Sequence, residues 1–238
     1  MSKLPDDLFP NMIFEENEYH TFLKYIKLKG IFLHKQVYDI ILLTDEKATY
    51  SEISTIIRYD KYLRDVLYKY LSALEEQWRS LLFEYFEYDS SKDEILTGDI
   101  KIDKVIPKID YSSSNFYWAT YNKNFTLNKL ITIMKPKIEL LGLNVYDDEF
   151  DTIKDLRNKV MHHNLIMFSH HTSVGAVDTE IKILEYKIMV LWKLLDSNIR
   201  NAIEVAINKG NYKGGNYQKE KANLNRYCLR RFENGVFI

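Results

Sequence analysis

The stretch SEISTIIRYDKYLRDVLYKYLSALEEQWRSLLFEYFEY, residues 51–88, decides the fold class. Its apolar side chains recur at steps of three and four residues, and no Gly or Pro interrupts them: Tyr59, Tyr62, Leu63, Val66, Leu67, Tyr70, Leu71, Leu74, Trp78, Leu81, Leu82 and Phe86. This periodicity predicts one long amphipathic helix. At 1.5 Å per residue such a helix spans much of a domain, so we expect it to form the central pillar of an all-α protein.

Weaker patterns on both sides predict further helices, which we place at residues 10–28, 31–43, 127–141, 145–168 and 178–209. Residues 89–114 are polar and lack the helical pattern, so we expect an irregular loop or insertion there. With only eight Gly and four Pro, the chain has too few turn signals for a β-sandwich. We expect an N-terminal helical segment at 1–50, a helical core at 51–208 and a basic tail at 209–238, within one compact domain.

Charge and cysteine content narrow the function classes. The 238 residues include 33 Lys and Arg against 34 Asp and Glu, so no overall positive field indicates a nucleic-acid partner. The single cysteine, Cys228, excludes an intrachain disulfide and multi-cysteine metal sites, which is typical of a reducing compartment. No run approaches the roughly 18 apolar residues that a membrane span requires. We expect a soluble cytoplasmic protein without membrane contact.

Basic residues gather near the C-terminal end. Residues 209–231 contain seven Lys and Arg against one Glu, a local net charge of +6, and Tyr212, Tyr217 and Tyr227 lie among them. Single-stranded nucleic acid is bound by this combination of cations and aromatic rings. Two interpretations stand side by side: a solvated basic tail without a ligand, or an RNA contact made by Lys213, Lys219, Lys221, Arg226, Arg230 and Arg231.

The segment LRNKVMHHN, residues 156–164, carries the side chains best suited to chemistry, in the form R-N-x-x-x-H: Arg157, Asn158 and His162. A histidine with an ordinary pKa near ~6.5 exchanges a proton at neutral pH, and an arginine binds phosphate oxygens through two donors. With RNA as substrate, the 2′-hydroxyl is an internal nucleophile. The reaction leaves a 2′,3′-cyclic phosphate, needs no metal or other cofactor, and fails on DNA.

The spacing of these residues poses a geometric problem. On an ideal helix Arg157 and His162 differ by roughly 140° around the axis and ~7.5 Å along it, whereas Asn158 and His162 share a face. One regular helix therefore does not bring the arginine and histidine tips to one atom. We expect either a local distortion or a second copy of the chain to complete the site.

Two other interpretations of this segment stand. An arginine and a histidine on a partly exposed helix are common, so the pair also fits a structural role. Metal binding is the other, because His162, His163, His170 and His171 fall within ten residues. Adjacent histidines point in different directions on a helix, and the spacings of zinc enzymes are missing, so we expect no metal site.

Two stretches together resemble a known family. LRNKVMHHNL resembles the signature of the HEPN superfamily, all-helical domains whose R-(polar)-x-x-x-H motif carries metal-independent RNA cleavage. The central helix is similar to that of the Abi-like abortive-infection proteins, the AbiD and AbiF group, at Tyr59, Asp60, Leu63, Arg64, Leu71, Leu74, Glu75 and Arg79. The segment Phe125-Thr126-Leu127 also looks like this group, and the similarity covers roughly residues 55–170.

The resemblance implies a helical bundle that forms a homodimer, with two Arg–His sets facing each other across a cleft. It implies a toxin that acts in bacterial anti-phage defence and is held in check by an antitoxin RNA or protein. In this picture Arg157 binds the scissile phosphate, His162 is the acid or base, Asn158 orients them, and His163 supports or replaces His162. Glu75 and Arg79 would form an i, i+4 ion pair, with a structural role or a contribution to the cleft.

Two rival functions stay open. One is an RNA-binding protein that holds a small structured RNA in a defence ribonucleoprotein without cutting it. The other is a helical module that interacts only with proteins. Bound RNA with intact ends favours the first, and absence of any RNA favours the second.

Overall fold

The computed structural model describes residues 7–15, 17–87, 126–139, 141–162, 165–168, 174–211 and 224–238. Seven α-helices make up most of this part of the chain, and each of its strands is two residues long. The prediction of an all-α fold is confirmed. The irregular segment predicted at 89–114 lies outside the described residues. No helix among the described residues is both long and apolar enough to cross a bilayer.

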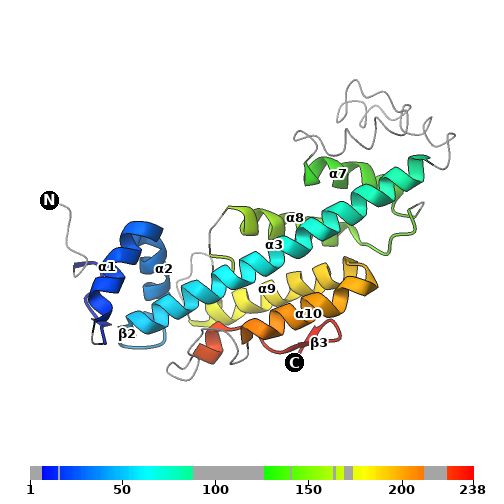
Figure 1. The fold of residues 1–238 in the computed structure, drawn as a ribbon. Coiled ribbons are helices and arrows are strands. Elements are labelled where there is room, and N and C mark those ends of the chain that lie inside the picture. Colours follow the sequence, from blue (N-terminus) through cyan, green and yellow to red (C-terminus); the bar gives the residue numbers. More distant parts are fainter. Residues whose placement is uncertain are drawn as a thin grey trace.

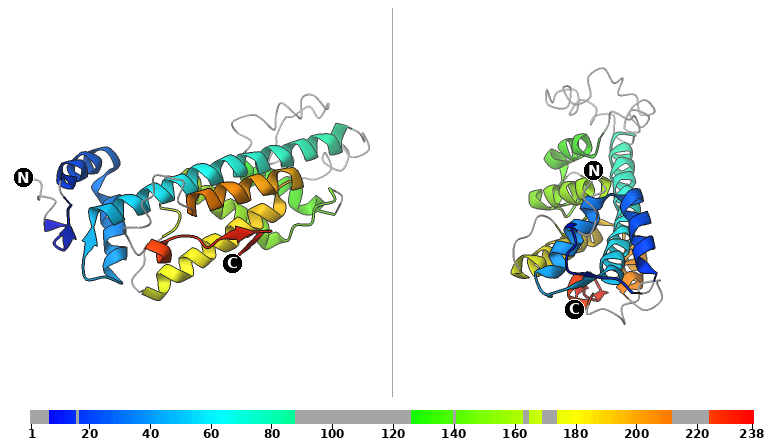
Figure 2. Two further views of the ribbon diagram at one scale, coloured as in Figure 1. Left: turned by 60° about the horizontal axis from the view of Figure 1, so that its bottom comes forward. Right: turned by 90° about the vertical axis from the view of Figure 1, so that its left-hand side faces the viewer.

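The central pillar is helix α3, Tyr50–Glu87, within one residue of the predicted range. Its 38 residues extend about 57 Å. The helices α1 and α2 lie at its N-terminal end, α7 and α8 along one side, and α9 and α10 along another (Figures 1 and 2). Their bounds are Glu18–Lys29 for α1, Ile31–Leu42 for α2, Leu127–Met134 for α7, Asp147–Met161 for α8, Val174–Leu194 for α9 and Ser197–Asn211 for α10.

The core lies between α3 and the helices that flank it. Leu63, Leu67, Leu74 and Trp78 on α3 are almost completely buried. The rings of Trp78 and Phe150, the latter on α8, have centroids 5.3 Å apart. Burial of large side chains at these heptad-like steps is the main force that holds the helices together.

The N-terminal segment differs from its predicted form. Strand β1, Met12–Ile13, occupies part of the predicted helix and pairs in parallel with strand β2, Ala48–Thr49. Helix α1 begins only at Glu18, whose carboxylate accepts the backbone N–H of Glu15 at 3.0 Å and so ties the preceding chain to the first turn. Gly30, at φ 85°, separates α1 from α2, a backbone conformation that glycine adopts without strain.

The predicted helix at 178–209 is two helices, because a side chain from α3 interrupts it. The amide of Gln77 donates to the carbonyl of Leu194 and accepts the N–H of Asp196. The Asp196 carboxylate then accepts the N–H of Asn198 at 2.8 Å and caps α10. The apolar periodicity continues through this break, so it carries no sign of the interruption.

Two other predicted helices are shorter than expected. Helix α7 ends at Met134 and passes into the 3₁₀ turn η2, Lys135–Lys137, where Pro136 lacks the N–H that a regular helix would use. Helix α8 ends at Met161 and not at Phe168. At its start, buried Glu149 accepts the N–H of Tyr146 and pairs with Lys193, which fixes α8 against α9.

Residues 224–238 fold back onto the helices, although a basic tail was predicted there. They form the 3₁₀ turn η3, Leu224–Tyr227, and a hairpin of β3, Phe232–Glu233, with β4, Val236–Phe237. Asn234 and Gly235 both have positive φ, as a two-residue hairpin turn requires. Phe232 and Phe237 stack 4.5 Å apart and join the core.

Candidate functional site

The residues of the R-N-x-x-x-H pattern lie at the C-terminal end of α8. Arg157 and Asn158 are in the helix and half-buried. His162 is exposed, follows the last helical residue, and donates its backbone N–H to the carbonyl of Asn158 at 3.1 Å. His163 lies outside the described residues. Arg157 therefore lies within α8, whereas His162 lies just beyond its last turn.

An open groove adjoins this end of α8. It has a volume of about 430 Å³ and lies between α8 and α3, where it is lined by Lys61, Arg64, Asp65, Tyr68, Val160 and Met161. Arg157 precedes Val160 and Met161 by three and four residues, so it lies on the face of α8 that borders the groove. His162 directly follows Met161. Arg157 and His162 are therefore close in sequence to the α8 wall of the groove, although neither is among its lining residues, and the α3 wall carries Lys61 and Arg64.

None of the side chains that α3 contributes to this wall was predicted as a site residue; Arg64 was named only among the positions at which the central helix resembles the Abi-like group. Lys61, Arg64, Asp65 and Tyr68 stand at i, i+3, i+4 and i+7, which places them on one face of the helix. Tyr68 is 51% exposed, a large apolar ring among charged neighbours. An exposed aromatic residue at helical spacing from two cations is the sequence signal that could have revealed this wall.

Asp60 connects the two motifs. Its carboxylate is completely buried and accepts the backbone N–H groups of Ile166 and Met167 at 2.7 and 3.2 Å. Its other oxygen accepts a hydrogen bond from Arg64 at 3.2 Å. Burial raises the pKa of Asp60 to about 6, against the opposing effects of Arg64 and the two backbone donors. Asp60 therefore holds the chain just beyond the R-N-x-x-x-H pattern against α3.

This anchor also explains why α8 stops before Phe168. The amides of Ile166 and Met167 point at the carboxylate of Asp60 and so are not available to a helix. Arg64 lies between the anchor and the groove: it binds Asp60 with one nitrogen and lines the groove with its side chain. Its buried Nε–H finds no acceptor among the described residues.

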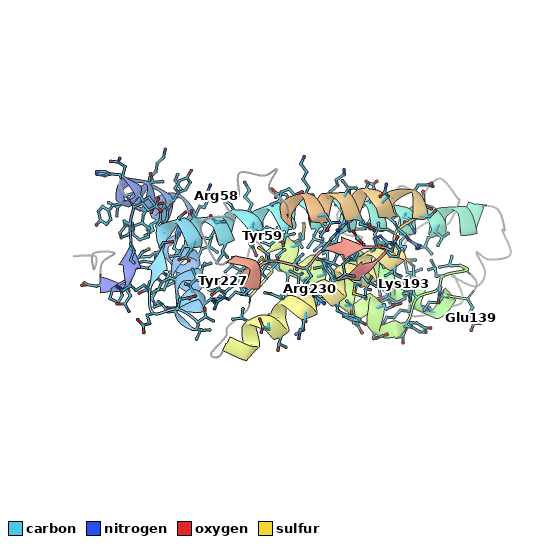
Figure 3. All side chains as sticks on the ribbon, turned by 90° about the horizontal axis from the view of Figure 1, so that it is seen from below. Arg58, Tyr59, Glu139, Lys193, Tyr227 and Arg230 are labelled. Carbon is cyan, nitrogen blue, oxygen red and sulfur yellow. The ribbon has the colours of Figure 1, made fainter. Side chains whose placement is uncertain are left out.

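Tyr59, beside Asp60, ties the C-terminal segment to the same part of α3. Its buried hydroxyl accepts the backbone N–H of Leu229 at 3.2 Å, and burial raises its pKa well above the usual value. In Figure 3 Tyr59, Tyr227 and Arg230 lie where the C-terminal segment passes α3, while Arg58 lies toward α1 and α2. Arg58 and Tyr59, although adjacent in sequence, therefore lie at different surfaces of the protein.

The predicted RNA-binding residues of the C-terminal region divide into two groups. Lys213, Lys219 and Lys221 lie outside the described residues. The three arginines make ion pairs within the chain: Arg226 with Asp45 at 3.7 Å, Arg230 with Glu185 at 2.7 Å, and Arg231 with Glu233. The pair of Arg230 is bidentate, and the Glu185 side chain is only 3% exposed. The charge of Arg230 is thus engaged by the fold.

Glu75 and Arg79 form the ion pair that their spacing predicts. Glu75 is seven residues beyond Tyr68, about 10 Å further along α3. The structure therefore places this pair beyond the residues that line the groove.

Among the described residues, no group of three or more His, Cys, Asp or Glu side chains is arranged to hold a metal ion. Of the four clustered histidines, only His162 belongs to this part of the chain; His163, His170 and His171 lie outside it. The comparison of the chain with protein-family models, with curated proteins and with solved structures gave no significant match.

Proposed function

We propose that this protein is a metal-independent endoribonuclease of the HEPN superfamily, in its Abi-like AbiD/AbiF group, and that it acts in bacterial abortive infection against phage. One observation carries the proposal: two motifs separated by almost a hundred residues meet at one groove. Arg64 of the first motif lines the groove, and Asp60 of the same motif holds the backbone just beyond the second.

The groove has the charges that RNA requires. Lys61 and Arg64 line one wall, and Arg157 lies on α8 three residues before Val160 of the other wall, so positive side chains stand on both sides of a phosphate held there. Tyr68 offers an exposed ring on which a base can stack. Asp65 is the acidic side chain of the lining, and it directly follows Arg64 in the sequence. These features favour a single-stranded segment of RNA as the ligand.

In the proposed reaction the 2′-hydroxyl loses its proton and attacks the adjacent phosphorus. The bond from phosphorus to the 5′-oxygen breaks, and that oxygen takes up a proton. The products are a 2′,3′-cyclic phosphate and a 5′-hydroxyl. His162 is the group that exchanges the proton, and Arg157 stabilises the charge that develops on the phosphoryl oxygens.

A second copy of the chain would supply the missing geometry. His162 is exposed, and Met161 beside it is 38% exposed, so this end of α8 is open to a partner. In a two-fold pair, the Arg157 of one copy would face the His162 of the other. An antitoxin RNA or protein that covers the groove would keep such an enzyme inactive.

The second candidate function is RNA binding without cleavage, in a defence ribonucleoprotein. The observation that favours it is the combination of Tyr68 with Lys61 and Arg64, which is sufficient for binding and needs no proton exchange.

The test is cleavage of a single-stranded RNA in the presence of EDTA by the wild type, Arg157→Ala and His162→Ala, with His20→Ala as control. His20 is an exposed histidine on α1, away from the groove lining. We expect the wild type and the control to cut the RNA but not the matching DNA, and both motif variants to lose at least about a hundredfold in rate. RNA binding without cleavage by the wild type would favour the second function. Cleavage that persists in both motif variants would contradict the proposed site.

A further inference from the structure

A second pocket opens on α3 at the end nearest α1 and α2. It has a volume of about 290 Å³, close to the lower limit of ligand pockets. Its lining includes Tyr25, Lys29, His34, Tyr50, Ser54 and Arg58. Part of it comes from each of three helices, so their packing fixes its shape. None of these residues belongs to the motifs described above.

The lining of the pocket contains two cations, Lys29 and Arg58, and its lining residues include no Asp or Glu. Burial and the nearby charges of Lys61, Arg58 and Arg64 lower the pKa of Lys29. Among the described residues, no acidic side chain forms an ion pair with Lys29. Like charges held this close repel one another, and a bound anion would remove that cost. Arg58 is fixed by hydrogen bonds from its guanidinium to the carbonyl and hydroxyl of Ser54, at 3.2 and 2.8 Å.

Three aromatic rings, those of Tyr25, His34 and Tyr50, also line the pocket. His34 and Tyr50 stack with their planes 14° apart, and both are buried. The Nδ1–H of His34 donates to the carbonyl of Gly30, which leaves Nε2 as the acceptor of the ring. Tyr25 is 39% exposed, and the Lys29 ammonium lies 5.4 Å from the centre of its ring. The pocket therefore presents an accessible ring directly beside a cation.

The pocket and the groove are neighbours on α3. Arg58 lines the pocket and Lys61 lines the groove, three residues further along the helix. Arg58 and Arg64 are separated by about 9 Å along the axis. Lys29 interacts electrostatically with the cations of both sites. One stripe of positive charge thus continues from the groove into the pocket.

We propose that this pocket binds a single nucleotide, with its phosphate between Lys29 and Arg58 and its base against the ring of Tyr25. The nucleotide comes from one of two sources: the RNA strand that continues from the groove, or a free nucleotide that acts as an effector. Nothing in the proposal requires cleavage of RNA, so it is separable from the proposed ribonuclease activity.

The experiment measures the affinity of the full chain for 5′-AMP and for single-stranded RNAs of three and eight nucleotides. The variants are Lys29→Ala and Tyr25→Ala, with Lys29→Arg to restore the charge. Lys27→Ala is the matched control, because Lys27 lies in the same last turn of α1 but lines neither site. Lys61→Ala reports on the groove.

We expect Lys29→Ala and Tyr25→Ala to weaken binding about tenfold, and Lys27→Ala and Lys29→Arg to retain the wild-type affinity. If these two variants lose affinity for the eight-nucleotide RNA but not for the three-nucleotide RNA, the nucleotide in the pocket belongs to the RNA strand that continues from the groove. If they lose affinity for 5′-AMP alone, the ligand of the pocket is a free nucleotide.

Equal affinities of Lys29→Ala and Lys27→Ala for all three ligands would contradict the proposal that the pocket binds a nucleotide. If the wild type does not bind RNA but binds 5′-AMP in a way that depends on Lys29, the ribonuclease proposal is contradicted. The proposal that the pocket binds a nucleotide is then still supported.

Discussion

The carboxylate of Asp60 accepts a hydrogen bond from the backbone N–H of Ile166 at 2.7 Å, across 106 residues of sequence. The same carboxylate binds Met167 and Arg64. A single buried side chain therefore sets the position of the chain after the R-N-x-x-x-H pattern, the end of α8 and the orientation of a cation in the groove. Stability and the geometry of the proposed site depend on the same residue.

Removal of this anchor should destabilise the protein strongly. In Asp60→Ala two buried amides lose their acceptor and Arg64 loses its counter-charge, which should cost about 3 to 5 kcal/mol of unfolding free energy. Asp65→Ala is the control, because Asp65 is exposed, and its effect should stay within about 0.5 kcal/mol. The unfolding free energies of both variants are measured by urea denaturation. Similar midpoints for the two variants would show that the anchor contributes little.

The raised pKa of Asp60 predicts a pH dependence of stability. An acid with a folded-state pKa of about 6, against an ordinary 3.8, binds its proton more tightly in the folded state. Its contribution is therefore greatest below pH 4 and is lost as the pH rises to about 6, on the order of 2 to 3 kcal/mol.

The comparison that isolates this effect is wild type against Asp60→Asn, which keeps an acceptor oxygen but does not titrate. Burial lowers the pKa of His34, and this dependence has the opposite sign, but both proteins contain His34. We expect the wild type to lose stability relative to Asp60→Asn between pH 4 and 6. A constant difference across this range would contradict the raised pKa.

Tyr68 should contribute to RNA affinity through base stacking. Tyr68→Ala should weaken the binding of single-stranded RNA by about 1 to 3 kcal/mol, with little change in stability, because the ring is half exposed. Tyr186→Ala is a matched control: Tyr186 is 48% exposed on α9 and lines neither pocket. Fluorescence anisotropy with a labelled RNA gives both affinities. An equal loss in the two variants would exclude a specific role for Tyr68.

Arg230 should act on stability and not on RNA binding. Its removal leaves the buried carboxylate of Glu185 without its bidentate partner, and we expect a loss of about 1 to 3 kcal/mol. Arg231→Ala should have a smaller effect, since the pair of Arg231 with Glu233 is more exposed. RNA affinity should be unchanged in both. If Arg230→Ala lowers the affinity for RNA without changing stability, the C-terminal arginines contact RNA as the sequence suggested.

The features that were predictable from the sequence are those encoded by local periodicity. Helix α3 was predicted to within one residue because its apolar steps continue without Gly or Pro. The Asn234-Gly235 turn between Phe232 and Phe237 also had a local signal, an Asn-Gly pair flanked by apolar residues, which the positive charge of the preceding residues obscured.

Long-range contacts account for what was not predictable. Gln77 splits α9 from α10, and Asp60 ends α8, in both cases by hydrogen bonds to backbone groups more than a hundred residues away. Backbone groups are the same in every residue and leave no mark in the sequence. The groove shares this origin, because Tyr68 and Met161 line one site only after α3 and α8 have packed.

The most direct test of the central claim is the chemistry of RNA ends. Wild-type and Arg157→Ala proteins are purified, the RNA that accompanies each is extracted, and its 3′ ends are mapped by sequencing. The ribonuclease proposal predicts 2′,3′-cyclic phosphate ends with the wild type and their absence with Arg157→Ala. One intact RNA species bound equally by both proteins would contradict cleavage at this site and favour a ribonucleoprotein.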